Sequence, residues 1–293
     1  MQTAKNLKEY KQQLQDALDN RFLRDTLDRF AVAYPAGRAR AFQGMDVEAL
    51  VAEIAAAKDD AIDRLDELYD QFRENAAARG IHVHLAHDAA EANRLVVEIA
   101  RETGCRRVVK SKSMTAEETL LNHHLEAEGL EVTETDLGEW IIQLRHEGPS
   151  HMVMPAIHLS RHQVADLFGA VTGRLQDPDI ERLVKVARRE LRRKYVEADM
   201  GITGANFALA DTATLGLTTN EGNARLTAAL PRVLHRDELT ARPVAHAGSV
   251  VVVALAAFQW FQALNAGSGR EAVRQESATR ARSSAAVEAS SPC

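Results

Sequence analysis

Cysteine is nearly missing from this 293-residue chain, which has only Cys105 and Cys293. A disulfide framework and a cysteine-ligated metal site are thereby excluded within the chain, and we expect a reducing compartment, the cytoplasm. Long apolar runs are missing too, since the longest, Val250 to Phe258, is too short to span a bilayer. The opening stretch "MQTAKNLKEYKQQLQDALDN" has no apolar core, so we do not expect it to be a signal peptide.

A surplus of positive charge is also missing. The chain has 36 basic and 42 acidic residues and a formal net charge of −6. This balance argues against nucleic acid or an anionic membrane surface as the main partner. No P-loop, GxSxG or HExxH motif occurs in the sequence. Function therefore has to be sought in less general patterns.

Helical periodicity dominates residues 1–79, which we predict to be an N-terminal helical extension. Apolar residues recur there at three- and four-residue spacing. We expect Pro35 and Gly37 to interrupt the first helix and Asp46 to cap the next one. The extension is expected to act as a scaffold that clamps the rest of the chain.

Strands and helices alternate after residue 80. The predicted strands are 81–86, 106–110 and 130–135, and the predicted helices are 88–104, 116–129, 161–169 and 178–199. Residues 201–226 are expected to form a turn, a strand, a tight turn, a second strand and a polar loop. This alternation predicts an α/β domain over 80–266 with a mostly parallel sheet. Residues 267–293, rich in Ser, Ala and Arg, are predicted to be disordered.

The stretch "VVKSKSM" places two lysines and two serines between a predicted strand and a predicted helix. Thr115 and Glu118 form a capping-box pattern that predicts the start of that helix. Ligands bind outside the carboxyl ends of parallel strands, and a helix N-terminus beside lysines favours an anion. We therefore predict a site for a carboxylate or a phosphate. A solvated loop whose lysines pair with surface acids is the alternative.

Three further polar segments follow predicted strands. "ETDLGEW" offers acids for general acid/base work, or is a polar turn around Gly138. "EGPSHMVMPAIH" is expected to bring His151 and His158 near another strand, as site residues or as packed histidines. "NEGN", Asn220 to Asn223, is able to bind a substrate through its amides, or is an Asn-Gly turn.

These segments, together with "GITGANFALADTATLGLTTNEGNARL", resemble in order the LUD domain of the lactate-utilisation iron–sulfur (LutB) family, from about residue 10 to residue 232. The resemblance implies a three-layer α/β/α fold similar to the NagB/RpiA/CoA-transferase-like class. It also implies a subunit of a cytoplasmic complex that oxidises L-lactate to pyruvate. The expected partners are other lactate-utilisation subunits and a small carboxylate.

The resemblance also implies a set of site residues. The substrate-binding residues would be Lys110, Ser111, Lys112, Ser113, Asp136, Glu139, His151, His158, Thr203, Asn206, Asn220 and Asn223. Fold analogy with CoA transferases suggests Glu221 as a catalytic residue. The alternatives are a non-catalytic assembly subunit and an independent CoA-transferase-like enzyme. A cavity that holds both Lys112 and Glu221 would favour an enzyme, and a flat surface would favour assembly.

The sequence departs from the family pattern in two places. Ala213 stands where the pattern has glycine, so a positive φ there would be strained. The family continues into a cysteine-rich module that ligates 4Fe–4S clusters, whereas two cysteines cannot hold one, so we expect no cofactor in this chain. The resemblance stops after Arg232, where we expect a truncation or a change of reading frame. We expect Ser249–Phe258 to take the place of the last strand.

Overall fold

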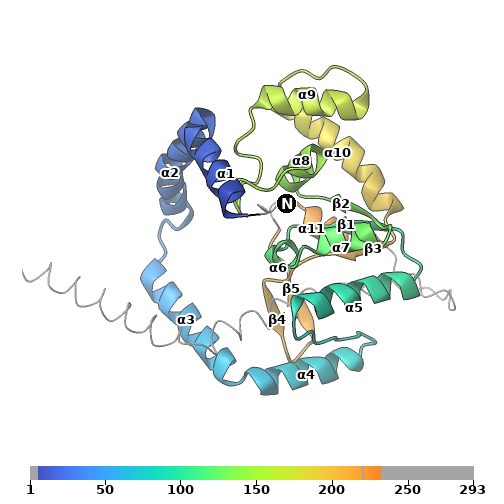
Figure 1. Cartoon of the computed structure of the whole chain (residues 1–293). Helices are drawn as coiled ribbons and strands as arrows, with labels where there is room; N and C mark the ends of the chain where they lie inside the picture. The colour runs from blue at the N-terminus through green and yellow to red at the C-terminus, as the bar shows by residue number, and fades with distance from the viewer. Residues whose placement is uncertain (1–5, 220, 232–293) are drawn as a thin grey trace, which may run out of the picture.

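A three-stranded parallel sheet organises the computed structural model, which describes residues 6–219 and 221–231 (Figure 1). Strand β1 (Arg107–Lys110) lies between β2 (Glu131–Glu134) and β3 (Met200–Ile202). Both neighbours run parallel to β1, and its last residue is in register with the last residues of both. All three strands therefore end at one edge of the sheet.

Helices cover both faces of this sheet, which gives the predicted three-layer α/β/α arrangement. Successive residues of a strand point to opposite faces. Val108 accordingly packs with α5 (Ala89–Glu102) and α7 (Leu121–Ala127). Val109 packs on the other side. The helices of that second layer are α8 (Leu137–Arg145), α9 (Arg161–Thr172) and α10 (Ile180–Glu197). The expected fold class is thus confirmed.

Helix α11 (Asn223–Ala229) lies against β3 at a position where only glycine fits. A Cβ added to Gly201 would lie 2.0 Å from the carbonyl oxygen of Thr227. Gly201 therefore allows the helix backbone to touch the strand backbone, and this contact brings the loop before α11 to the sheet edge.

A small hairpin stands apart from the sheet. β4 (Phe207–Leu209) and β5 (Thr214–Gly216) pair antiparallel, in keeping with the predicted strand, tight turn and strand. Helix α4 (Leu65–Ala77) packs on it, and the Nδ2 of Asn75 donates to the Ala210 carbonyl oxygen at 2.9 Å. Ala213 has φ +49° in the turn, so the strain expected from its Cβ is present.

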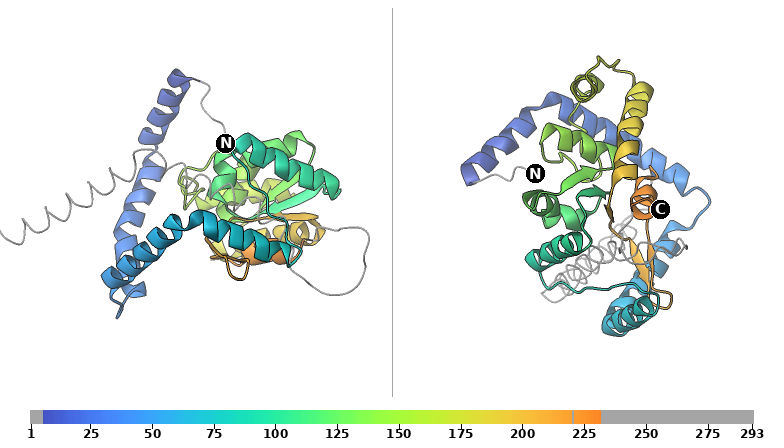
Figure 2. Two further views of the ribbon diagram at one scale, coloured as in Figure 1. Left: turned by 90° about the horizontal axis from the view of Figure 1, so that it is seen from below. Right: turned by 90° about the vertical axis from the view of Figure 1, so that its right-hand side faces the viewer.

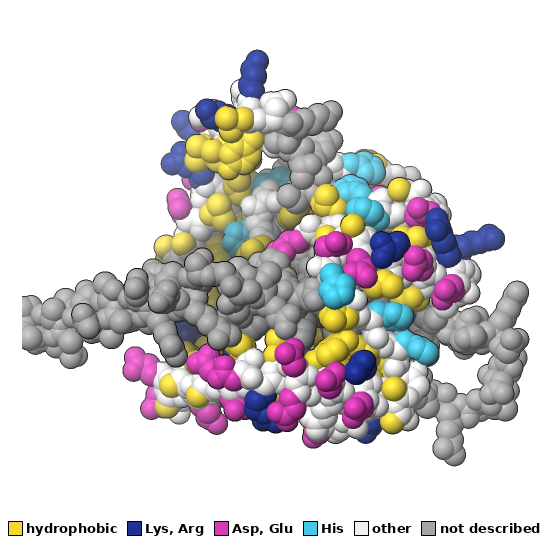
Figure 3. Space-filling model, turned by 60° about the horizontal axis from the view of Figure 1, so that its bottom comes forward, with side chains coloured by type: hydrophobic (Ala, Val, Ile, Leu, Met, Phe, Trp, Pro, Cys, Tyr) yellow, Lys and Arg dark blue, Asp and Glu magenta, His cyan; other side chains and the backbone are white. Residues whose placement is uncertain are grey.

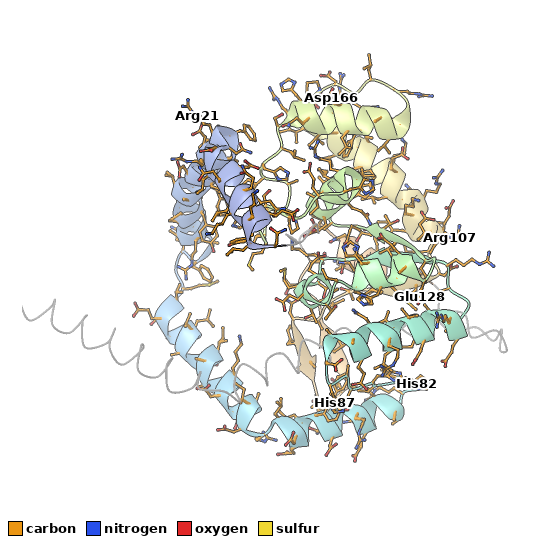
Figure 4. The ribbon with its side chains drawn as sticks, in the orientation of Figure 1. Arg21, His82, His87, Arg107, Glu128 and Asp166 are labelled. Atoms are coloured by element: carbon orange, nitrogen blue, oxygen red, sulfur yellow. The ribbon has the colours of Figure 1, made fainter. Side chains whose placement is uncertain are left out.

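Three helices form what we call the helical arm, α1 (Leu7–Asp19), α2 (Arg21–Ala41) and α3 (Val47–Asp63). No residue of these helices is buried. Figures 1 and 2 show the arm curving around one side of the α/β unit. Arg21, labelled in Figure 4, lies at the α1–α2 turn, well separated from the sheet. Asp46 caps α3 as predicted, accepting from the Ala49 amide at 3.0 Å.

The predicted strand at 81–86 is wrong, because this segment has no strand conformation and pairs with none of the described strands. Ile81 and Val83 instead pack against the cluster of α4 and the hairpin, so their alternation reflects burial without a ladder. The predicted break at Pro35 and Gly37 is also wrong, since α2 continues through both. A proline removes one backbone hydrogen bond, because it has no N–H to donate to the carbonyl oxygen four residues earlier. The alanines and arginines around Pro35 are strong helix formers, and they favour continuation of the helix.

Two predicted helix boundaries need correction. Ser113, rather than a Thr115–Glu118 capping box, begins α6 (Met114–Glu118), because its Oγ accepts from the Ala116 amide at 3.3 Å. The predicted helix at 116–129 is divided, since Leu120 adopts φ +54° between α6 and α7.

Several expectations concern residues outside the described ranges. They are the role of Asn220, the change after Arg232, the strand at Ser249–Phe258 and the tail at 267–293. None of the described helices is long and apolar enough to cross a membrane. On one face of the α/β unit, acidic and histidine side chains gather (Figure 3).

Candidate functional site

The loops that leave the sheet edge enclose a cavity of about 730 Å³, which we call the sheet-edge cavity. Loop 111–115 follows β1, residues 136–138 follow β2, and residues 203–206 follow β3. Residues 153–157, 217–219, 221, 223 and 224 complete the wall, with Ile141. This is where ligands bind in open parallel sheets.

Eight of the residues predicted for the site line this cavity. They are Ser111, Lys112, Ser113, Asp136, Thr203, Asn206, Glu221 and Asn223. The lysine-serine loop and the described part of the "NEGN" segment thus meet, although they are far apart in the sequence.

A hydrogen bond joins two hydroxyl groups that follow the ends of β1 and β3. The Oγ of Ser111 donates to the Oγ1 of Thr203 at 2.6 Å, and both residues are buried. The next residue, Gly204, lies close to Ser113, since a Cβ at position 204 would lie 3.3 Å from the Oγ of Ser113. The Oδ1 of Asn206 accepts from the Thr218 amide at 2.7 Å, which closes the base of the hairpin at the cavity wall.

Lys112 supplies the basic group of the cavity. Its side chain is 24% exposed and forms an ion pair with Glu139, whose side chain is 3% exposed. Burial raises the pKa of Glu139, and the charge of Lys112 opposes that shift. Lys112 thus lines the cavity, and its counter-ion Glu139 is buried.

Two carboxylates occupy the N-terminus of α8. The Oδ1 of Asp136 accepts from the amides of Gly138 at 3.0 Å and Glu139 at 3.2 Å. The Oε2 of Glu221 accepts from the Leu137 amide at 3.3 Å. Desolvation and the neighbouring charge of Asp136 raise the pKa of Glu221, while the Leu137 amide lowers it. Glu221 is therefore a better proton acceptor than a fully solvated glutamate.

Lys110 does not line the cavity, unlike its neighbour Lys112. Its side chain is 0% exposed, and its Nζ lies 2.9 Å from the Oε1 of Glu117 and 2.8 Å from the Oε1 of Glu134. Burial acts to lower the pKa of Lys110, but the charges of Glu134 and Glu117 outweigh it and raise the pKa. This lysine ties β1, β2 and α6 together beneath the loop.

His151 and His158 lie outside the cavity, and the strand expected near them is wrong, since residues 146–160 contain none. The Nδ1 of His151 accepts from the Val153 amide at 3.1 Å. The Nε2 of His158 lies 3.0 Å from the Oε2 of Glu147. Both histidines hold the loop that presents Val153 to the cavity.

Sequence reasoning missed the apolar part of the wall, formed by Val153–Ile157 and Leu217. One signal was available in "DLGEW". A Cβ on Gly138 would lie 3.0 Å from the Cδ of Pro155, so this glycine marks a close approach between two segments. The partner in such an approach cannot be read from the glycine alone.

The described residues do not fit an iron–sulfur cluster. Cys105 is the only cysteine within the described ranges, and burial raises the pKa of its thiol. Within those ranges no three His, Cys, Asp or Glu side chains gather to hold a metal ion. A 4Fe–4S cluster needs about four thiolates.

Comparison with known proteins adds a family to this geometry. The family model "LUD domain" matches residues 69–234, which is more than half of the chain. This chain belongs to the LUD domain family. The resemblance expected from the loop motifs is thus confirmed, and the sheet-edge cavity lies inside the matched range.

The LUD domain is similar to several curated proteins that carry the name "Lactate utilization protein B". The one from Bacillus velezensis is 41% identical over 225 residues, which cover 76% of this chain and 47% of the relative. The Bacillus subtilis protein is 40% identical over 228 residues, with the same shares covered. The Geobacillus kaustophilus protein is 47% identical over 172 residues, or 58% of this chain and 36% of the relative. The chain thus spans about half the length of these relatives. No solved structure matches it.

Proposed function

We propose that this LUD domain takes part in lactate utilisation by binding the carboxylate of a small hydroxy or oxo acid, L-lactate or pyruvate, in the sheet-edge cavity. The observation that carries the proposal is Lys112, a lysine with a partly exposed side chain that lines a cavity of about 730 Å³ where three parallel strands end. The names of the similar proteins support the choice of acid.

The chemistry of the cavity suits such a ligand. Lys112 pairs with the substrate carboxylate. The Ser113 hydroxyl, whose oxygen accepts from the Ala116 amide, donates its own proton to the carboxylate, whereas the proton of Ser111 is engaged with Thr203. Glu221, whose pKa is raised, accepts the proton of the substrate hydroxyl. Oxidation of lactate also breaks the C–H bond of the carbon that bears the hydroxyl, and it needs an acceptor for that hydrogen and two electrons. Because the described residues do not fit a cluster, we propose that the acceptor lies in another subunit of a cytoplasmic complex.

A second candidate rests on the position of Glu221 on the same wall. In a CoA-transferase-like reaction its carboxylate would attack a CoA thioester, expel the thiolate and become an acyl-enzyme. Hydroxylamine attacks the glutamyl carbonyl of such an anhydride and releases the acyl group as a carboxylate, so a peptide with a hydroxamate at Glu221, absent in Glu221→Gln, would support this candidate. A cavity that holds both Lys112 and Glu221 gives less support to a purely assembling role.

Calorimetry with L-lactate and pyruvate tests the first proposal. We expect Lys112→Ala to weaken binding by at least about tenfold, because a charge-assisted hydrogen bond to the carboxylate is lost. Lys185→Ala is the matched control, since Lys185 is exposed on α10 and does not line the cavity. Equal affinity in wild type and Lys112→Ala, or no binding by wild type, would contradict the proposal.

A further inference from the structure

A second cavity, of about 280 Å³, lies behind the Lys112–Glu139 ion pair. We call it the acidic cavity. Its acidic lining consists of Glu117, Glu126, Glu134, Glu139 and Glu147, and its other polar residues are Asn122, Gln143, His123 and His146. Lys112 lines the sheet-edge cavity and its partner Glu139 lines this one, so the ion pair forms part of the wall between them.

Two oxygen atoms in the wall have no hydrogen-bond donor among the described residues, the Oδ1 of Asn122 and the Oε2 of Glu134. The other polar atoms of these two side chains form a hydrogen bond with each other, in which the Nδ2 of Asn122 donates to the Oε1 of Glu134 at 2.6 Å. Gln143 is already engaged with the β2 backbone. Buried acceptors without donors are uncommon and costly, so these two oxygen atoms need an N–H or O–H group that the described residues do not give them.

Among the described residues, the carboxylates of the acidic cavity outnumber the lysine and arginine side chains that pair with them. Glu139 has Lys112 and Glu147 has Arg145 as a partner. Glu117 and Glu134, in contrast, share the single ammonium of Lys110. The side chain of Glu134 is 4% exposed, so solvent compensates its charge poorly.

We propose that the acidic cavity binds a small organic cation rich in N–H groups, an alkylammonium or an amidinium. Such a cation supplies in one group the donors that Asn122 and Glu134 lack and the charge that Lys110 does not cover. A volume of about 280 Å³ suits a ligand of a few heavy atoms. The two cavities share no lining residue.

A proton on Glu134 is the competing occupant of the same position. A protonated carboxyl paired with an amide would make both missing hydrogen bonds at once, from Oε2 to the Oδ1 of Asn122. Burial raises the pKa of Glu134, with Lys110 and Asn122 opposing the shift. The experiment therefore has to separate a cation from a proton.

Titration of the full chain, followed by NMR of the Asn122 side-chain amide at about pH 8, tests the proposal. The probes are methylammonium and acetamidinium, with tetramethylammonium as a cation that has no N–H group and Mg²⁺ as a metal. We expect saturable shifts with the first two probes and none with tetramethylammonium. No response, an equal response to tetramethylammonium, or a response to Mg²⁺ alone would overturn the proposal.

Variants sharpen the result. Glu134→Gln should weaken methylammonium binding by at least about tenfold, and its new amide can still donate to Asn122. Glu126→Gln, at an exposed part of the lining, keeps the test valid if the first variant does not fold, and should weaken binding about twofold or more. Glu118→Gln, exposed and outside the cavity, should bind like wild type.

Equal binding by wild type and the two cavity variants overturns the proposal. So does an infrared band of a protonated carboxyl at that pH that disappears in Glu134→Gln.

Discussion

The helical arm and the α/β unit have similar sequence patterns but different surroundings. Both contain amphipathic helices, yet no arm residue is buried, whereas α10 alone buries Leu183, Val186 and Leu191. In the arm, Val32 remains 80% exposed. An apolar stripe in the sequence thus predicts a helix, but its side chains are buried only where another helix or a sheet packs against that stripe. Stability should therefore reside in the α/β unit.

The largest expected difference between the two regions is the loss of stability when an apolar side chain is shortened in each. Phe168 of α9 is 1% exposed and packs on Trp140 with ring centroids 5.2 Å apart. Phe168→Ala should lower the free energy of unfolding by about 3–5 kcal/mol, because it leaves a cavity in the core. Val32→Ala, in the arm, should change it by less than about 0.5 kcal/mol.

Chemical denaturation followed by circular dichroism measures both values. Similar effects of the two substitutions would mean that the arm contributes to the same cooperative unit as the sheet, and the contrast would fail.

A second substitution tests the backbone contact between β3 and α11. Gly201→Ala should destabilise the α/β unit by about 3 kcal/mol, because the new Cβ would meet the Thr227 carbonyl oxygen at 2.0 Å. Gly37→Ala in the arm is the matched control, since nothing lies within 4 Å of a Cβ there. A stable Gly201→Ala protein with unchanged denaturation midpoint would show that α11 is free to move away from the strand.

The smallest expected effect concerns pH. The pKa of Glu134 is raised in the folded chain above its ordinary value of 4.5. The folded state then binds more protons than the unfolded state above that pH, so stability should fall as pH rises from about 4.5 through the folded pKa. The slope is at most about 1.4 kcal/mol per pH unit for one group.

Glu134→Gln should remove this slope, because glutamine does not titrate. Thermal unfolding across the pH range, compared with Glu128→Gln at an exposed site, measures the difference. An identical pH dependence in the Glu134→Gln and wild-type proteins would assign the slope to other groups.

Local signals predicted a good part of the fold. The helix at 88–104 was evident from its cap, since the Oδ1 of Asp88 accepts from the Glu91 amide at 2.8 Å. Strands β1 and β2 were evident from short segments that contain valine or threonine and lie between predicted helices. Strand β3 was missed, because Met200–Ile202 is short and is recognisable only by its pairing with β1. Periodicity describes one segment, whereas strand pairing depends on a distant one.

The candidate site divides in the same way. The rule that ligands bind at the carboxyl ends of parallel strands selected the loop around Lys112. It could not separate Lys112 from Lys110, two residues away. One lysine meets the cavity and the other is enclosed by Glu117 and Glu134, which come from different elements. Histidines that hold a loop, such as His158, cannot be told from ligand-binding histidines by spacing.

The order of the strands has a consequence for how the chain folds during synthesis. β2 pairs with β1 across a short connection, whereas β3 pairs with β1 only after α8, α9 and α10 have been made. The connection from β1 to β3 is roughly fourfold longer than the one from β1 to β2, so bringing its ends together costs about 1 kcal/mol more in chain entropy. A nascent chain that ends before β3 can therefore form half of the sheet with the other edge of β1 unpaired. That edge would be open to association with other chains until Met200–Ile202 arrives.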